Sequence, residues 1–295
     1  MSAKARPSEA DGDVPMPVGS DVTYIVMYSG GLSSYEAARR CIEQYGKDRV
    51  RLWFADTQVE DEDLYRFNED VKRILDLDIR TFAQYDPEGN VMDIWDVMKK
   101  ERFIANSRID PCSKLIKRKP LRKALEEEYN PENVVVVLGM DNIEDCHRVE
   151  RARFHHRPFA VYYPLLEGEP PFKVHIMNDL RRQGIEPPRL YDMGFKHNNC
   201  GGFCVKAGIG QMAHLLKQLP ERYAFHEQKE EEMRAFLGKN QSVLSRVVRG
   251  ERRVFTLSDL RLAVESGEKF AYDEFVSDVS CACFSPWFED EIEPV

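Results

Sequence analysis

The fold is decided by the stretch Val22-Thr-Tyr-Ile-Val-Met-Tyr28-Ser29-Gly30-Gly31-Leu32-Ser33-Ser34 near the start of the chain. Its first seven residues form an apolar, β-branched run that stops at a serine and two glycines, which is typical of a buried parallel strand. Residues 32–45 then carry the spacing of an amphipathic helix. A strand, a glycine turn and a helix are the first half of a βαβ unit.

The same alternation continues along the chain. The pattern predicts further strands at 50–55, 79–82 and 134–138, and further helices at 60–75 and 113–129. Strands that alternate with helices predict an α/β fold: an open, mainly parallel sheet with helices on both faces and ligands at the carboxyl ends of the strands. We expect three parts, namely a flexible tail at 1–21, a nucleotide-binding α/β domain at 22–165, and a mainly helical, cysteine-containing region at 166–295.

Composition excludes several classes of protein. The chain has 295 residues, of which 42% are hydrophobic and 11% aromatic, too many for a disordered chain and enough to bury a core. The longest apolar run, 134–138, is far shorter than the roughly 20 residues that a membrane span needs. Because the first 21 residues lack the apolar segment of a signal peptide, we expect a cytoplasmic protein with no membrane partner. In that reducing compartment the seven cysteines favour metal ligation or thiol chemistry over disulfides.

The loop that follows the first predicted strand can bind an anion. Its two glycines let backbone N–H groups turn toward a phosphate, and the start of the next helix adds a partial positive charge. The hydroxyls of Ser29, Ser33 and Ser34 can donate to phosphate oxygens. These residues alone equally allow a serine N-cap beside a glycine turn. They match neither a Walker A loop, because no Gly-Lys-Ser/Thr follows, nor a dinucleotide fingerprint.

Five ordered motifs resemble the ATP pyrophosphatase and PAPS reductase superfamily. Residues 29–34 resemble its pyrophosphate loop, SGGxDS, with Ser33 in place of the aspartate. The other segments are Trp53 to Glu60 (F-x-D-T-x-x-E), Pro111 to Leu121 (CC-x-x-x-K-x-x-PL), Leu138 to Arg151 (G-x-R-x-x-x-S-x-x-R) and Tyr163 to Cys204 (PL…LYD…GC-x-x-C). The resemblance spans about residues 22–210 and implies the adenine-nucleotide-binding α/β fold of that superfamily.

The resemblance also implies a nucleotide site. The residues that would hold ATP are Ser29, Gly30, Gly31, Ser33 and Ser34 at the pyrophosphate, with Asp56, Thr57 and Gly139 beside them. Mg²⁺ would neutralise the leaving group. The candidate catalytic cations are Lys117, Arg118, Arg148 and Arg151. The alternative for the basic run at 114–123 is a solvated helix face.

A metal site is implied by the same resemblance. In adenylyl-sulfate reductases and some related sulfur-transfer enzymes, cysteines at the places of Cys112, Cys200 and Cys204 hold a [4Fe–4S] cluster. The second cysteine of the family's CC pair is Ser113 here, so either Cys281 or Cys283 completes four thiolates or one iron stays open. Zinc is the alternative metal, because it suits four thiolates equally well. The two remaining cysteines, Cys41 and Cys146, we interpret as buried structural thiols.

Two departures from the reductases favour a triphosphate ligand. Reductases of the superfamily tend to carry SFG in the loop and a C-terminal ECG-x-H segment, whereas this chain has SGG and no such segment. We therefore expect an ATP pyrophosphatase that adenylates a substrate oxygen for sulfur transfer. The expected acceptor is a nucleic acid, either DNA, as in DNA phosphorothioation, or tRNA, and the sulfur donor is a partner such as a cysteine desulfurase. The alternatives are a phosphoadenylyl-sulfate or adenylyl-sulfate reductase and a non-catalytic nucleotide-binding module.

The charges of the chain are unevenly distributed. The formal net charge is -9, from 51 acidic and 42 basic side chains, so the field of the whole protein does not attract a polyanion. Arg246, Arg249, Arg252 and Arg253 nevertheless form a local basic cluster. This cluster predicts either a contact with a polyanion backbone or a solvated turn.

Overall fold

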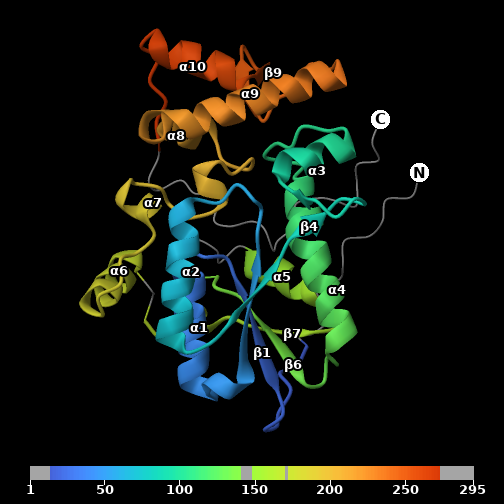
Figure 1. The fold of residues 1–295 in the computed structure, drawn as a ribbon, viewed down its shortest axis with the longest axis vertical. Helices are drawn as coiled ribbons and strands as arrows, with labels where there is room; N and C mark the ends of the chain where they lie inside the picture. Colours follow the sequence, from blue (N-terminus) through green and yellow to red (C-terminus); the bar gives the residue numbers. More distant parts are fainter. Residues whose placement is uncertain (1–13, 141–147, 170–171, 273–295) are drawn as a thin grey trace.

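A five-stranded parallel sheet forms the centre of the computed structural model, which describes residues 14–140, 148–169 and 172–272 (Figure 1). The strands are β1 (Thr23–Tyr28), β2 (Val50–Ala55), β3 (Ile79–Phe82), β6 (Val134–Val137) and β7 (Ala160–Tyr162). Their order is β3-β2-β1-β6-β7, and every neighbouring pair is parallel. The direction of strand succession reverses between β1 and β6, which is where open α/β sheets bind their ligands.

Helices cover both faces of this sheet, as the sequence predicts. Alternate residues of β1 (Tyr24, Val26 and Tyr28) belong to one core, which is shared with α1 (Leu32–Tyr45), α2 (Glu62–Leu75) and α6 (Lys173–Arg182). The intervening residues, Ile25 and Met27, belong to another core, shared with α4 (Lys119–Glu128) and α5 (Val149–His156). Figure 1 shows the two groups of helices on opposite sides of the strands. Cys41 is fully buried in the first core, which confirms its predicted structural role.

A third core lies beyond one end of the sheet. Its helices are α3 (Ile94–Glu101), α8 (Ile209–Gln218), α9 (Pro220–Leu237) and α10 (Leu257–Glu265), and it also includes the hairpin of β8 (Leu244–Val248) and β9 (Glu251–Phe255). Cys112 and Cys204 are members of this core. Residues 92–116 thus pack with residues 190–264, across the domain boundary expected at 165. Figure 1 shows α8, α9 and α10 grouped together above the sheet.

Shorter elements connect these layers. They are the strands β4 (Gln84–Tyr85) and β5 (Val91–Met92), α7 (Arg189–Asp192), a π-helix (Ser113–Arg118), and 3₁₀ helices at Lys47–Arg49, Pro164–Leu166 and Cys200–Gly202. No helix within the described ranges combines the length and the apolar character that crossing a membrane requires.

The structure differs from the predicted elements in several places. The helix predicted from residue 60 begins at Glu62, because the side chain of Asp61 caps it by accepting a hydrogen bond from Asp63 N. The helix predicted at 113–129 is a π-helix that continues into α4. The sequence pattern does not predict β7, β8 or β9, because β7 is very short and β8 and β9 carry arginines where a buried strand carries apolar residues.

A buried histidine joins α9 to the rest of the third core. His226 stacks on Phe203 with ring centroids 3.7 Å apart, and its Nδ1 accepts a hydrogen bond from Trp95 Nε1 at 3.0 Å. Burial, aided by the positive charge of Arg222, lowers the pKa of His226 from 6.5 to about 3. The imidazole is therefore neutral in the folded protein at neutral pH.

We predict that this imidazole makes the protein less stable in mild acid. Between pH 6.5 and about 3 the unfolded chain binds one proton more than the folded chain at His226, so its contribution to the free energy of unfolding is complete above pH 6.5 and falls by up to about 1.4 kcal/mol per pH unit on acidification. His226→Gln keeps an acceptor for Trp95 without a titrating ring, so its stability should fall less steeply between pH 6 and pH 4. Urea unfolding at several pH values measures both slopes, and equal slopes would contradict this role.

Candidate functional site

The loop between β1 and α1 is braced by its own hydrogen bonds. Ser34 Oγ accepts a hydrogen bond from Ser29 N at 3.1 Å and donates one to Gly31 O at 2.8 Å. Gly30 has a φ of 76°, and a Cβ there would lie 2.7 Å from Leu64 Cδ1. This position therefore requires glycine, and the Ser34 hydroxyl serves to hold the shape of the loop.

Gly139 places β6 directly against this loop. A Cβ at position 139 would lie 2.8 Å from Ser33 O and 3.0 Å from Ser34 Cα. The backbone after β6 and the first turn of α1 are therefore in direct contact. The structure thus brings Gly139 together with the loop residues at the crevice between β1 and β6, as predicted for a ligand site.

The first turn of α1 presents backbone donors at this crevice. Gly31 is the N-cap and makes no side-chain capping bond, and Leu32 N donates to Tyr191 Oη at 3.2 Å. The hydrogen bonds within the described ranges leave the N–H groups of Gly30, Gly31, Ser33 and Ser34 without an acceptor. Such uncapped N–H groups, together with the helix dipole, favour a bound anion.

Two residues far along the chain make hydrogen bonds to the backbone of the loop and of the first turn of α1. The sequence patterns did not assign either residue to the site. One is Tyr191 on α7, and the other is Asn198, whose Nδ2 donates to Gly30 O at 3.0 Å. Asn198 Oδ1 is buried and finds no hydrogen-bond partner in the part of the chain that is described. The available signals were the Leu-Tyr-Asp segment at 190–192 and the paired asparagines just before Cys200.

Polar residues at the carboxyl end of β2 connect the loop region to the cysteines. Asp56 Oδ1 accepts hydrogen bonds from Gln58 N at 2.8 Å and from Tyr65 Oη at 3.0 Å. Thr57 Oγ1 donates to Glu60 Oε1 at 2.8 Å, and Glu60 Oε2 accepts from the backbone N–H of Cys200. Burial raises the pKa of Glu60 to about 7, although the charge of Lys117 opposes this shift. Glu60 closes the Trp53 to Glu60 segment, but sequence reasoning did not assign it to the site.

The next carboxylate fixes the cysteine loop to the sheet. Asp61 is fully buried and accepts hydrogen bonds from Arg189 Nε at 2.9 Å and from Arg222 Nη1 at 2.6 Å. Arg222 Nη1 also donates to Gly201 O at 2.9 Å. Since a buried carboxylate without partners would be strongly destabilising, these contacts hold α2, α7 and α9 in one arrangement.

Three predicted metal ligands line one small cavity. Cys112, Cys200 and Cys204 are buried around a volume of about 10 Å³, which is room for about one water molecule. Cys200 has a φ of 50° and is followed by two glycines with positive φ, so the chain turns tightly between the two thiols. A hydrogen bond with Cys204, together with burial, raises the pKa of the Cys200 thiol well above its usual value.

The fit of this cavity to a metal is partial. Thiols are the donors that zinc and iron–sulfur clusters take. Within the described ranges, however, no three His, Cys, Asp or Glu side chains are gathered so as to hold a metal ion. Cys281 and Cys283, like Cys146, lie outside the described residues. The predicted cluster or zinc site therefore stays a prediction, and we derive no reaction step from it.

The predicted catalytic cations lie in different surroundings. Lys117, on the π-helix, is only 6% exposed and shares the cysteine cavity with Thr57 and the three thiols. Arg148 is buried at the start of α5, whereas Arg118 and Arg151 are half-buried. The structure thus brings the predicted catalytic residue Lys117 together with the predicted nucleotide-binding residue Thr57. The same cavity holds the three predicted metal ligands, Cys112, Cys200 and Cys204.

A second lysine borders the cavity as part of a buried ion pair. Lys206 Nζ lies 3.2 Å from Asp110 Oδ2, and both side chains are almost fully buried. A buried pair of this kind is costly to break, because removing either partner leaves an uncompensated charge. The cavity is therefore bordered by two ammonium groups, and that of Lys206 is paired with Asp110.

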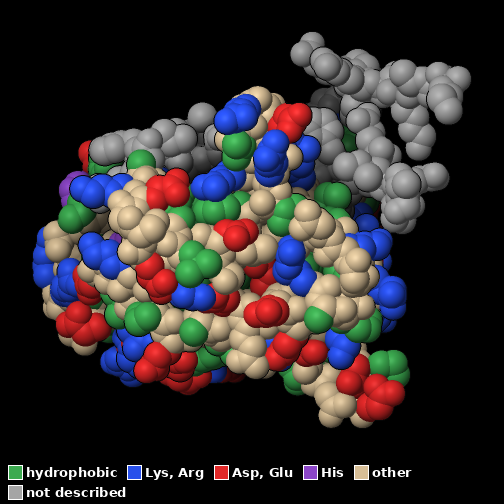
Figure 2. Space-filling view, turned by 90° about the horizontal axis from the view of Figure 1, so that it is seen from above, with side chains coloured by type: hydrophobic (Ala, Val, Ile, Leu, Met, Phe, Trp, Pro, Cys, Tyr) green, Lys and Arg blue, Asp and Glu red, His purple; other side chains and the backbone are tan. Residues whose placement is uncertain are grey.

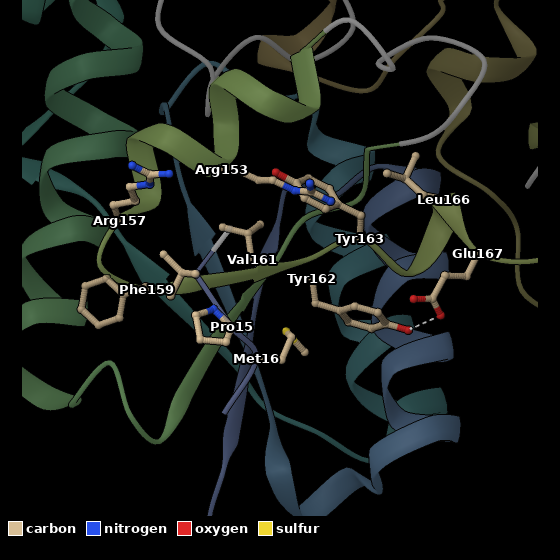
Figure 3. Close-up of a pocket in the computed structure, with 11 residues that line it drawn as sticks. Pro15, Met16, Arg153, Arg157, Phe159, Val161, Tyr162, Tyr163, Leu166 and Glu167 are labelled. Carbon is tan, nitrogen blue, oxygen red and sulfur yellow. Dashed lines mark hydrogen bonds between the residues drawn. The ribbon is translucent and has the colours of Figure 1, made fainter. Parts of the chain in front are cut away.

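A separate, larger pocket lies on the outer strand of the sheet. It has a volume of about 460 Å³ and is lined in part by Arg153, Arg157, Phe159, Tyr162 and Glu167. Figure 3 shows Tyr162 pointing toward Glu167, to which its hydroxyl donates a hydrogen bond at 3.1 Å. None of the predicted site residues is among the described residues that line this pocket.

The fold and the site define an α/β protein. Its first helix begins with uncapped N–H groups where the strand order reverses between β1 and β6, and three cysteines line a separate small cavity. No family model matches the chain. An uncharacterized protein of Methanocaldococcus jannaschii is 26% identical over 200 residues, which cover 67% of this chain and 39% of that protein. The chain therefore corresponds to about two fifths of that relative's length.

A solved structure also shows a distant likeness. It is the crystal structure of phosphoadenylyl-sulfate (PAPS) reductase from Candida auris in its phosphate complex. The two chains are 17% identical, and the match covers 58% of this chain and 78% of that one with a TM-score of 0.37. A likeness at this level does not bear on the activity of the present chain.

We predict that Gly139→Ala displaces the loop. Its new Cβ would meet backbone atoms of Ser33 and Ser34, so the variant should lose about 1–3 kcal/mol of stability and bind Mg²⁺–ATP more weakly. Gly208→Ala is the matched control, because its Cβ meets nothing within 4 Å and its φ is -77°. Thermal unfolding and calorimetric titration with Mg²⁺–ATP measure both effects. A Gly139 variant that behaves like the control would contradict the contact.

Proposed function

We propose that the chain is an ATP pyrophosphatase that adenylates a substrate oxygen. The observation that carries this proposal is the braced loop between β1 and α1, in which the N–H groups of Gly30, Gly31, Ser33 and Ser34 have no acceptor within the described ranges. Donors of this kind suit the terminal phosphates of a triphosphate. The SGG sequence of the loop, in place of the reductases' SFG, supports the same choice.

In the proposed reaction a substrate oxygen attacks the α-phosphorus of ATP. A new P–O bond forms, the bond from the α-phosphorus to the bridging oxygen breaks, and pyrophosphate leaves with the electron pair. The N–H groups of the loop would stabilise the charge that develops on pyrophosphate, and Mg²⁺ supplies further neutralisation when bound. The ammonium of Lys117 would provide positive charge on the cysteine side of the site.

The second half of the proposal is sulfur transfer, in which sulfide attacks the carbon or phosphorus atom that bears the adenylated oxygen. A bond from sulfur to that atom forms, its bond to the oxygen breaks, and AMP leaves with the oxygen and the electron pair. The thiols of Cys112, Cys200 and Cys204 border the same cavity as Thr57, the second residue after β2. A [4Fe–4S] cluster or zinc bound by these cysteines would supply a soft site for a sulfide ligand. The proposed acceptor is DNA or tRNA, and the proposed sulfur donor is the persulfide of a cysteine desulfurase, from which excess cysteine thiol releases sulfide as a disulfide forms.

We predict that Lys117 is needed for turnover. Purified protein with Mg²⁺, α-labelled ATP, DNA or tRNA and a desulfurase with cysteine should release pyrophosphate and labelled AMP. Lys117→Met should lower this rate by about 10²-fold, the usual cost of removing one charge-stabilising group. Lys114→Met, on the exposed side of the same π-helix, is the control and should retain activity.

The same assay separates the alternatives. Release of orthophosphate in place of pyrophosphate would contradict the proposed chemistry. Sulfite release from phosphoadenylyl sulfate or adenylyl sulfate with thioredoxin would identify a reductase instead. Binding of ATP without turnover under all of these conditions would identify a non-catalytic module.

We predict a thiolate-bound metal in protein prepared without oxygen. A [4Fe–4S] cluster would give a brown protein with about four irons and acid-labile sulfide per chain, whereas a zinc site would give a colourless protein with zinc. Cys112→Ser should reduce the metal content, and Cys41→Ala, in the core of the sheet, should leave it unchanged. Metal analysis and the visible spectrum give the result, and the finding of neither metal would exclude this part of the proposal.

A further inference from the structure

The arginine cluster lies on a two-stranded β-hairpin. β8 and β9 pair in antiparallel register around the turn Arg249-Gly250, and this hairpin, Leu244–Phe255, is called the arginine hairpin below. At its base Leu244 pairs with Phe255, and both side chains are buried. The four arginines Arg246, Arg249, Arg252 and Arg253 are all exposed. The structure thus gives a definite conformation to a segment that the sequence pattern left open.

The register of the hairpin opposes like charges. Arg246 lies directly opposite Arg253, an arrangement that destabilises a strand pair. Acidic neighbours offset it only in part, because Arg246 is 3.7 Å from Glu268 and Arg253 is 3.1 Å from Glu251, both on the surface. With four arginines and one glutamate, the hairpin carries a net charge of +3 in a chain of net charge -9.

The backbone conformation of the turn is also unfavourable for one of its two residues. Arg249 has a φ of 53° and Gly250 a φ of 84°. A two-residue turn with both φ values positive favours Asn-Gly, because asparagine tolerates the left-handed conformation better than other non-glycine residues. Arginine at position 249 is therefore less favourable for the stability of this turn than asparagine would be.

The base of the hairpin is held firmly by one buried carboxylate. Glu230 of α9 accepts hydrogen bonds from Val243 N at 2.9 Å on one side of the hairpin and from Leu257 N at 2.7 Å on the other. Ser242 Oγ donates to the same carboxylate at 2.7 Å. The arginines are thus carried on a fixed base, and Figure 1 shows β9 beside α10 at the end of the molecule away from the sheet.

We propose that the arginine hairpin binds the phosphate backbone of a nucleic acid. All four cations are arginine, whose planar guanidinium binds phosphate through two hydrogen bonds at once. A cavity of about 310 Å³ between the hairpin and α10 is lined in part by Arg246, Arg253 and Asp259 and gives a phosphate room beside two guanidinium groups. Figure 2 shows Lys and Arg side chains interspersed with Asp and Glu side chains across the face of the molecule seen from above.

The shape and the side chains of the hairpin favour nucleic acid over a lipid surface. A two-stranded ribbon fits the major groove of a duplex, where its side chains reach phosphates on both walls. A membrane surface would call for several exposed apolar side chains, whereas Val247, 65% exposed, is the one apolar residue of the hairpin that is well exposed. This proposal goes beyond the proposed ATP chemistry and is tested without nucleotide, so the two can fail separately.

The test measures binding of the whole protein to labelled 25-base-pair duplex DNA, single-stranded DNA and single-stranded RNA by fluorescence anisotropy at several salt concentrations. We expect affinity to fall with salt, with a slope of about -0.9 in log K against log[salt] for each phosphate contacted on duplex DNA. Arg249→Asn and Arg253→Thr should each weaken binding several-fold and reduce the slope by about 1. Because each substitution removes an unfavourable feature of the hairpin, neither should lower the unfolding temperature.

The control variants are Arg73→Asn on α2 and Arg182→Thr on α6, which make the same charge changes at exposed arginines of the other half of the molecule. We expect their affinities to match that of the unchanged protein. The proposal is overturned if the hairpin variants bind as tightly as these controls, or if the unchanged protein binds none of the three nucleic acids at low salt. Binding to phosphatidylserine vesicles in place of nucleic acid would also overturn it and would assign the hairpin to a membrane surface.

Discussion

The adjacent carboxylates Glu60 and Asp61 are the constraint on which the rest of the site depends. Both are buried at the end of the connection from β2 to α2. Both hold parts of the C-terminal region, Glu60 through Cys200 N and Asp61 through Arg189 and Arg222. Buried carboxylates persist only with such partners. The position of the cysteine loop relative to the sheet is therefore fixed by the same two residues that end the second βα connection.

The candidate site is assembled from two kinds of chemistry at one edge of the sheet. Backbone N–H groups at the start of α1 suit hard, anionic oxygen ligands. Cys112, Cys200 and Cys204 offer soft sulfur donors, and they come from segments that lie far from the loop in the sequence. The hydrogen bond from Asn198 to Gly30 joins the two parts. The proposed activation of an oxygen and delivery of sulfur would use both kinds of donor within one site.

Local patterns predicted the elements around the loop well, because each carries its own signal. The helix at 32–45 has the predicted bounds, and the strands at 50–55 and 79–82 do as well. The roles of Tyr191 and Asn198 could not be read from the sequence, because they reach the loop across 159 and 168 residues. The paired strands β8 and β9 were missed for another reason, since their exposed arginines hide the apolar base formed by Leu244 and Phe255. The ligands, the metal and the activity stay predictions.

Helix α9 carries both the residue that anchors the arginine hairpin, Glu230, and the residue that contacts the cysteine loop, Arg222. The two residues are eight positions apart, a distance of about 12 Å along the helix. The base of the hairpin and the peptide oxygen of Gly201 are therefore bound to the same helix at a fixed spacing. One rigid element thus sets the distance between the outermost part of the C-terminal region and the turn that carries Cys200 and Cys204.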